Sequence, residues 1–388
     1  MIVANKRDNF FILSGFLIVL LLGYFQMSYK PVLVSLIFTI SFLWLFIWFI
    51  LHLFSYKQSR NIFNVLLCSF ISSLHVILLS PSYVSFDYYN KLIMFICFLL
   101  FIYLCSSIRV NKKIVVYILI INVLLSLLYI YFYKFGVQFD LWNYLTLNFT
   151  NPNLTGIFLS YSFMYVFLIL ISRKELKYGK YSFCVVVFLA VTLVLLTFLT
   201  GSRGAILTEL CYVGFILIDK LMQGKLVAKK WIICIWSIVP MLFVIFYTAK
   251  QGDFGVGSML VDEEQGKSSS TRMIVWGPAL DIVEENIVFG DYCGISNGTG
   301  KSQMHNTHLD VIASYGLIPF LLFVLFLYKA VYSSSKNVYT NFNKYSLWAF
   351  MTCFVSGIFE AVLVAGGLCV YILACGFLLL ANSDIKQK

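Results

Sequence analysis

Three short segments hold the side chains of this chain that are best suited to chemistry. They are Thr200-Gly201-Ser202-Arg203-Gly204-Ala205, Ser269-Ser270-Thr271-Arg272 and His305-Asn306-Thr307-His308. Only 12% of all residues are charged, and the first and third segments directly adjoin long apolar runs. Arginine forms charge-assisted hydrogen bonds with phosphate, and histidine can act as a general base near neutral pH. Two arginines and a histidine on one side of a membrane indicate a site for a phosphorylated, lipid-carried substrate.

The first segment predicts a helix that begins at Arg203, with Ser202 as its N-cap. Main-chain N–H groups at a helix start attract anions, and each charge-assisted hydrogen bond contributes roughly 1.5–3 kcal/mol. This corner therefore suits a diphosphate. An interfacial arginine that reaches for lipid headgroups is the structural alternative. Arg272, at the start of a second predicted helix, is a candidate for another phosphate contact, and a solvated surface arginine is the alternative there.

The third segment predicts a capping box, with Thr307 as N-cap and Asp310 three residues later. It places His305 at the membrane boundary, where its imidazole is the candidate general base. His308 is a candidate second base or ligand. The two histidines have zinc-like spacing, but no third ligand follows at a suitable distance, so we expect no metal and no cofactor.

Two carboxylates, Glu209 and Glu360, fall inside apolar runs. Carboxylates within a membrane are costly and are candidates for function, although buried structural pairing explains them equally well. The residues with expected supporting roles at the site are Ser202, Asn306, His308, Glu209 and Glu360.

Composition determines the class of protein that positions these residues. The chain has 388 residues, of which 61% are hydrophobic, whereas a soluble domain carries about 25% charged residues. We therefore expect an all-α polytopic membrane protein with residues 1–388 in one transmembrane domain. We expect about twelve helices, from apolar runs that begin near Phe10, Val32, Ile62, Leu92, Ile114, Leu154, Tyr181, Ala205, Trp231, Leu309, Tyr345 and Gly367.

The distribution of charge predicts the orientation in the membrane. With a cytoplasmic N-terminus, 20 of the 28 basic residues fall in inner segments, as the positive-inside rule requires. Both termini are then cytoplasmic, all three motifs lie on the outer face, and the net charge of +11 reports topology instead of nucleic-acid binding.

The longest external loop, residues 250–306, contains a predicted amphipathic helix at about 271–287. Trp276, Leu280, Val283 and Ile287 recur at helical spacing, and Pro278 must kink or split the helix. We expect it to lie on the outer membrane surface with its apolar face down. A lid without chemistry is the alternative.

Other classes of membrane protein fit less well. The cytoplasmic loops are too short for a nucleotide-binding domain, and no phosphate-binding glycine motif is present. A transporter or flippase has polar groups near the midplane and often inverted repeats, whereas these spans are poor in charge and show no repeat. A purely structural scaffold does not need the arginine and histidine loops.

The order of the motifs resembles the O-antigen polymerase and O-antigen ligase superfamily of bacterial membrane glycosyltransferases. The similar pieces are Ser202-Arg203-Gly204-Ala205 opening a helix, Arg272 with Trp276, His305-Asn306 before a span, and Tyr315-Gly316-Leu317 within that span. The similarity extends over roughly residues 150–330. One departure follows the amphipathic helix: the family often has Gly-x-Gly there, and this chain has Gly290-Asp291-Tyr292.

The resemblance implies a GT-C-like fold and a glycan donor on undecaprenyl diphosphate, delivered by a flippase. It implies that Arg203 and Arg272 bind the diphosphate and that His305 activates the acceptor hydroxyl, with inversion at the anomeric carbon. The implied partners are this lipid-linked oligosaccharide and the lipid bilayer, with a flippase and a chain-length regulator as further candidates.

The preferred prediction is a polymerase that joins repeat units into capsular or O-antigen-type polysaccharide. A ligase that transfers finished glycan to another acceptor uses the same residues. The Phe-, Ile-, Lys- and Asn-rich composition suggests an AT-rich genome from an organism without lipid A, which favours the polymerase.

Overall fold

A computed structural model provides the structure of the chain. It describes residues 2–28, 30–55, 60–79, 86–135, 144–149, 152–222, 229–250, 276, 279–281, 283–291, 305–359 and 368–385. Two of the predicted site residues, Arg272 and Glu360, lie outside the described residues, as does Pro278.

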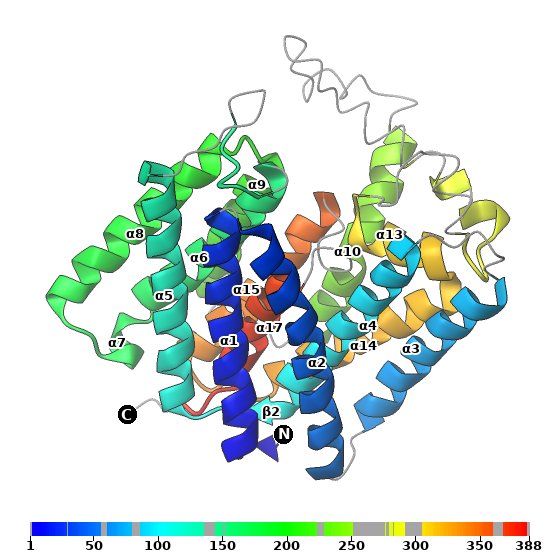
Figure 1. Cartoon of the computed structure of the whole chain (residues 1–388), viewed down its shortest axis with the longest axis horizontal. Helices are drawn as coiled ribbons and strands as arrows, with labels where there is room; N and C mark the ends of the chain where they lie inside the picture. Colours follow the sequence, from blue (N-terminus) through cyan, green and yellow to red (C-terminus); the bar gives the residue numbers. More distant parts are fainter. Residues whose placement is uncertain are drawn as a thin grey trace.

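Nearly all of the described chain is helical (Figure 1). The first half contains α1 (Lys6–Met27), α2 (Pro31–Ser55), α3 (Arg60–Leu79), α4 (Phe86–Ser107), α5 (Lys112–Phe135), α6 (Pro152–Ile171), α7 (Arg173–Leu176) and α8 (Lys180–Leu199). The second half contains α9 (Arg203–Leu221), α10 (Lys230–Lys250), α13 (Thr307–Tyr315), α14 (Leu317–Ser335), α15 (Asn341–Phe359) and α17 (Leu368–Ala381).

The predicted apolar runs coincide with helices in the described part of the chain, and the all-α class is confirmed. Six of the described helices are long and apolar enough to cross a membrane: α1, α2, α5, α6, α8 and α14. Many of their apolar side chains are exposed, as lipid contact requires; Phe188 of α8 is 63% exposed and Leu43 of α2 is 61% exposed. The chain is therefore a multi-pass membrane protein, and the count of about twelve spans stays a prediction.

Both ends of the described chain lie at the same end of the helix bundle, the lower end in Figure 1. There β1 (Ile2–Val3) pairs in parallel with β2 (Ile108–Arg109) in the connection from α4 to α5. Arg109 forms an ion pair with Asp384, just after α17. These contacts join the two ends of the chain and the α4–α5 connection.

Helix α15 lies inside the bundle and is buried along most of its length. It packs against α9, α17, α10 and α6. At its lower end, both carboxylate oxygens of Glu175 accept hydrogen bonds from the N–H groups of Asn341 and Phe342, at 3.0 and 2.8 Å. A carboxylate at this position compensates the unpaired donors of a helix start.

One predicted helix is in fact two. The apolar run from Leu309 is interrupted at Gly316, which ends α13 and begins α14 with φ +84° and ψ −177°. This backbone region is open to glycine and strained for other residues. The expectation that Tyr315-Gly316-Leu317 lies within a continuous span is therefore wrong.

Candidate active site

The start of α9 is built as the sequence predicts. Ser202 is the N-cap, and its hydroxyl accepts a hydrogen bond from the N–H of Ala205 at 3.4 Å. The preceding turn is held by Thr200, whose hydroxyl accepts from the N–H of Ser202 at 3.2 Å and donates to the carbonyl of Thr197 at 2.7 Å. Arg203, the first helical residue, has an exposed side chain. The first turn of α9 thus carries both an exposed arginine and the N–H groups of a helix start.

Close packing fixes this turn from two sides. Gly201 has φ +63°, and a Cβ at this position would lie 2.3 Å from the ring of Tyr144. On the other side, a Cβ on Gly156 of α6 would lie 2.6 Å from Cβ of Ser202. The segment that carries Tyr144 is attached to the turn, because Leu145 N–H donates to the carbonyl of Leu199 at 2.9 Å. Arg203 therefore extends from a rigid support.

Glu209 is buried in α9. Within the described residues its side chain contacts a threonine and not an arginine. Its Oε1 accepts a hydrogen bond from the hydroxyl of Thr197 in α8, at 2.7 Å. This contact joins α8 and α9 six residues, or about 1.7 turns, after Arg203. The described geometry gives Glu209 a structural contact, and a role in substrate binding stays a prediction.

The start of α13 differs from the predicted capping box. Asn306, not Thr307, is the N-cap: its Oδ1 accepts from the N–H groups of His308 and Leu309, each at 3.0 Å. Asparagine ranks above threonine as an N-cap. Its Nδ2 also donates to the carbonyls of Pro240 in α10 and Ile358 in α15, at 3.0 and 3.1 Å. A threonine hydroxyl offers only one donor, so it cannot bridge two helices in this way.

The carboxylate of Asp310, expected to complete the capping box, is used elsewhere. It forms a buried ion pair with Lys91 of α4 at 2.8 Å. Reasoning from the sequence missed this contact, because 219 residues separate the partners. The available signal was Lys91 directly before the apolar run that begins near Leu92, since this lysine lies inside α4.

His308 is fully buried in the first turn of α13. Its Nε2 lies 2.7 Å from the carbonyl oxygen of Ser237 in α10, so Nε2 carries the proton and donates. The ring is surrounded by the aromatic rings of Phe320, Phe323 and Phe354. This environment is that of a packed helix contact, with no metal ligand beside it, and the described residues contain no group of three or more potential metal ligands.

His305 is half-buried and has φ +51°, in the left-handed region. Non-glycine residues seldom adopt this conformation, and when they do they often lie at functional sites. The residue lies at the end of the long external loop and directly precedes the N-cap of α13. The imidazole therefore lies on a turn that is anchored on its C-terminal side by the hydrogen bonds of Asn306.

A helical part of the external loop packs against α10, which also contacts α13. Residues 276, 279–281 and 283–285 are helical, with Trp276, Ala279 and Val283 buried and residues 281, 284 and 285 exposed. The ring of Trp276 lies edge-on to Phe243 of α10, with ring centroids 6.2 Å apart. Arg272 itself is outside the described residues, so its position in the site stays a prediction.

Arg203 and His305 are brought to the same end of the bundle by α15. Lys344 near the start of α15 pairs with Asp219 near the end of α9, at 3.5 Å, so the two helices run antiparallel. Arg203 precedes Asp219 by 16 residues, and Ile358 follows Lys344 by 14. Since both helices rise about 1.5 Å per residue, Arg203 lies at nearly the same level as Ile358, which binds Asn306.

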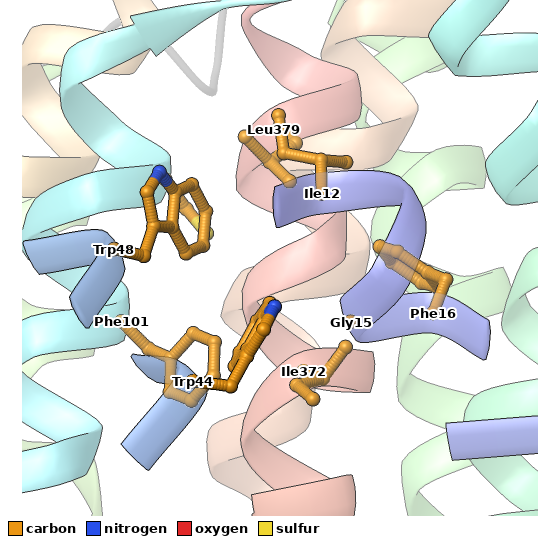
Figure 2. Close-up of a pocket in the computed structure, with 9 residues that line it drawn as sticks. Ile12, Gly15, Phe16, Trp44, Trp48, Phe101, Ile372 and Leu379 are labelled. Atoms are coloured by element: carbon orange, nitrogen blue, oxygen red, sulfur yellow. The ribbon is translucent and has the colours of Figure 1, made fainter. Parts of the chain in front are cut away.

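A small cavity of ≈ 10 Å³ lies elsewhere, among α1, α2, α4 and α17 (Figure 2). Trp44 and Trp48 of α2 face Ile12 and Gly15 of α1 across it. Its lining is almost entirely apolar: Ile12, Gly15, Phe16, Trp44, Trp48, Phe101, Cys105, Ile372 and Leu379. None of the predicted site residues borders it, and it offers no group that binds phosphate.

Comparison with known proteins agrees with the motifs. Residues 188–324 match the family model described as O-antigen ligase. The matched segment includes α9, α10 and α13, and therefore Arg203, Asn306 and His305. The resemblance to the O-antigen polymerase and ligase superfamily is confirmed over this segment. No curated protein and no solved structure matches the chain.

Proposed function

Since residues 188–324 match the family model described as O-antigen ligase, we propose that the chain is a glycosyltransferase of the bacterial cytoplasmic membrane. Its donor is an oligosaccharide carried on undecaprenyl diphosphate, and its reaction joins such repeat units into surface polysaccharide. The chemistry takes place on the extracytoplasmic face, and both termini are cytoplasmic. The observation that carries the proposal is the pair of helix starts, with Arg203 and His305, at one end of α15.

In the proposed reaction, Arg203 and the N–H groups at the start of α9 bind the diphosphate of the donor. Arg272 supplies a second cationic contact. As the bond between the anomeric carbon and the phosphate oxygen breaks, its electron pair leaves with undecaprenyl diphosphate. The arginine contacts stabilise the negative charge that develops on this leaving group.

His305 acts in this reaction as the general base. Its imidazole removes the proton from an acceptor hydroxyl as that oxygen forms the new bond to the anomeric carbon. Attack from the face opposite the leaving group inverts the configuration. The anchored N-cap Asn306 supports the turn that presents the imidazole. The donor itself supplies the energy, so the proposed reaction consumes no nucleotide.

The proposed acceptor is the sugar end of a second lipid-linked chain, which makes the protein a polymerase. The Phe-, Ile-, Lys- and Asn-rich composition supports this choice, because it indicates an AT-rich genome from an organism without lipid A. A ligase is the second candidate, because the matched family model is described as O-antigen ligase. In a ligase the same base activates a hydroxyl on another acceptor molecule.

Purified protein in liposomes with an undecaprenyl-diphosphate-linked repeat unit tests the function. A polymerase converts the donor into a ladder of products that differ by one repeat, with release of undecaprenyl diphosphate. Transfer of a preformed chain, once, to an added acceptor identifies a ligase. Donor that is moved between leaflets without chemical change contradicts both candidates and indicates a flippase.

A further inference from the structure

A buried ion pair joins α4 to α13 directly behind the proposed catalytic turn. Lys91 Nζ lies 2.8 Å from Asp310 Oδ1 and donates a second hydrogen bond to Ser314 Oγ at 3.1 Å. The side chains of Lys91 and Asp310 are only 6% and 0% exposed. None of these three residues takes part in the proposed binding of the diphosphate or in the proton transfer.

A contribution to folding stability does not by itself explain why a buried ion pair is present here. Two charges lose their hydration on burial, and apolar side chains of similar volume often replace a buried pair without loss of stability. The pair instead fixes the orientation of α13 relative to α4, because an ammonium between a carboxylate and a hydroxyl has few favourable orientations. Asp310 and Ser314 are four residues apart and lie on one face of α13, so the lysine restricts both rotation and sliding of this helix.

The opposite face of α13 is restrained by other helices. His308 donates to the carbonyl of Ser237 in α10, and Asn306 to the carbonyls of Pro240 and Ile358. Asp310 lies two residues from His308, which is about 200° around the helix. The residues Thr307–Tyr315 are all buried. α13 is thus held from both sides, and His305 precedes its N-cap by one residue.

We propose that Lys91, Asp310 and Ser314 are positioning residues that hold α13 in the orientation from which His305 reaches the acceptor hydroxyl. This inference rests on the proposed role of His305 as base. A misplacement of about 1 Å in a catalytic group can cost about 100-fold in rate. Loss of the ion pair is therefore expected to lower kcat and to leave the KM for the donor unchanged, because Arg203 is mounted on a different helix.

The test uses the double variant Lys91→Met with Asp310→Leu, assayed with the lipid-linked repeat unit beside thermal unfolding in detergent. We expect a folded protein with an unchanged donor KM and a kcat reduced by about 10- to 100-fold. The single variant Ser314→Ala removes one hydrogen bond and a single oxygen atom. It is expected to lower kcat by a smaller factor, again with an unchanged KM, and it keeps the test decisive if the double variant does not fold.

The matched control replaces the partly buried pair at the other end of the bundle, with Lys344→Met and Asp219→Leu. This pair also joins two helices, but it lies far along α9 and α15 from His305, so we expect wild-type kcat. The inference is overturned if folded Lys91→Met/Asp310→Leu protein or the Ser314→Ala variant turns over at the wild-type rate. Wild-type protein that makes no product overturns the proposed function instead, so the two failures are distinguishable.

Discussion

At the scale of single residues, the two groups proposed for chemistry are held in different ways. Arg203 is an exposed side chain on a rigid helix start, whereas His305 is half-buried in a left-handed turn. An exposed guanidinium can be removed without disturbing the packing of Ser202, Gly201 and Tyr144 beneath it. Its removal therefore affects binding far more than folding.

Arg203→Ala is expected to raise the KM for the lipid-linked donor and to lower kcat/KM by roughly 10- to 150-fold, which corresponds to the loss of about 1.5–3 kcal/mol for one charge-assisted hydrogen bond. The unfolding temperature should stay close to that of the wild type. Steady-state kinetics with purified donor measures the effect.

Arg173→Ala is the matched control, since Arg173 stacks on Phe183 in the α7–α8 region at the other end of the bundle. Equal kinetic losses in both variants would show that the effect of Arg203 is not specific to the site.

At the scale of elements, the break between α13 and α14 connects the external loop to the site. A Cβ on Gly316 would lie 2.2 Å from the carbonyl oxygen of Val288. Around this contact, Leu317 N–H donates to the carbonyl of Ile287 and Asp291 N–H to the carbonyl of Ala313, both at 2.8 Å. The end of the loop thus binds the exposed backbone of the helix break.

Gly316→Ala is expected to lower the free energy of unfolding by roughly 2–5 kcal/mol, because it adds backbone strain and a steric clash. Gly214→Ala is the control: Gly214 lies inside α9, and apart from the backbone of α9 itself no atom of the described residues lies within 4 Å of an added Cβ. That change should stabilise the protein by about 0.5–1 kcal/mol. Denaturation in detergent compares the two, and a Gly316→Ala variant as stable as the wild type would contradict the described break.

Helix starts and ends could be predicted where the residues that determine them are close in the sequence. Ser202 was predicted as an N-cap from its own position and is one. Thr307 was predicted for the same reason and is not, because Asn306 gains two further hydrogen bonds from α10 and α15. The break at Gly316 depends on Val288, 28 residues earlier, so the apolar run alone gave no sign of it.

At the scale of the whole molecule, hydropathy and charge predicted the membrane class and the positions of the helices, since both reflect contact with lipid along each run. The ion pair of Lys91 with Asp310 and the position of Arg203 near the end of α15 depend on how helices pack. One sequence contains no direct signal for such pairings. The motifs identify the candidate site residues, and the packing of the helices determines how these residues are arranged.

The proposed mechanism depends most on His305 as the base of a glycosyl transfer. The most direct measurement is the turnover of purified His305→Asn protein with the lipid-linked repeat unit. Asparagine tolerates the left-handed backbone that His305 adopts, so this variant should fold and bind donor as the wild type does. We expect kcat to fall by about 10²–10⁴-fold with an unchanged donor KM, whereas turnover at the wild-type rate would show that His305 is not the base.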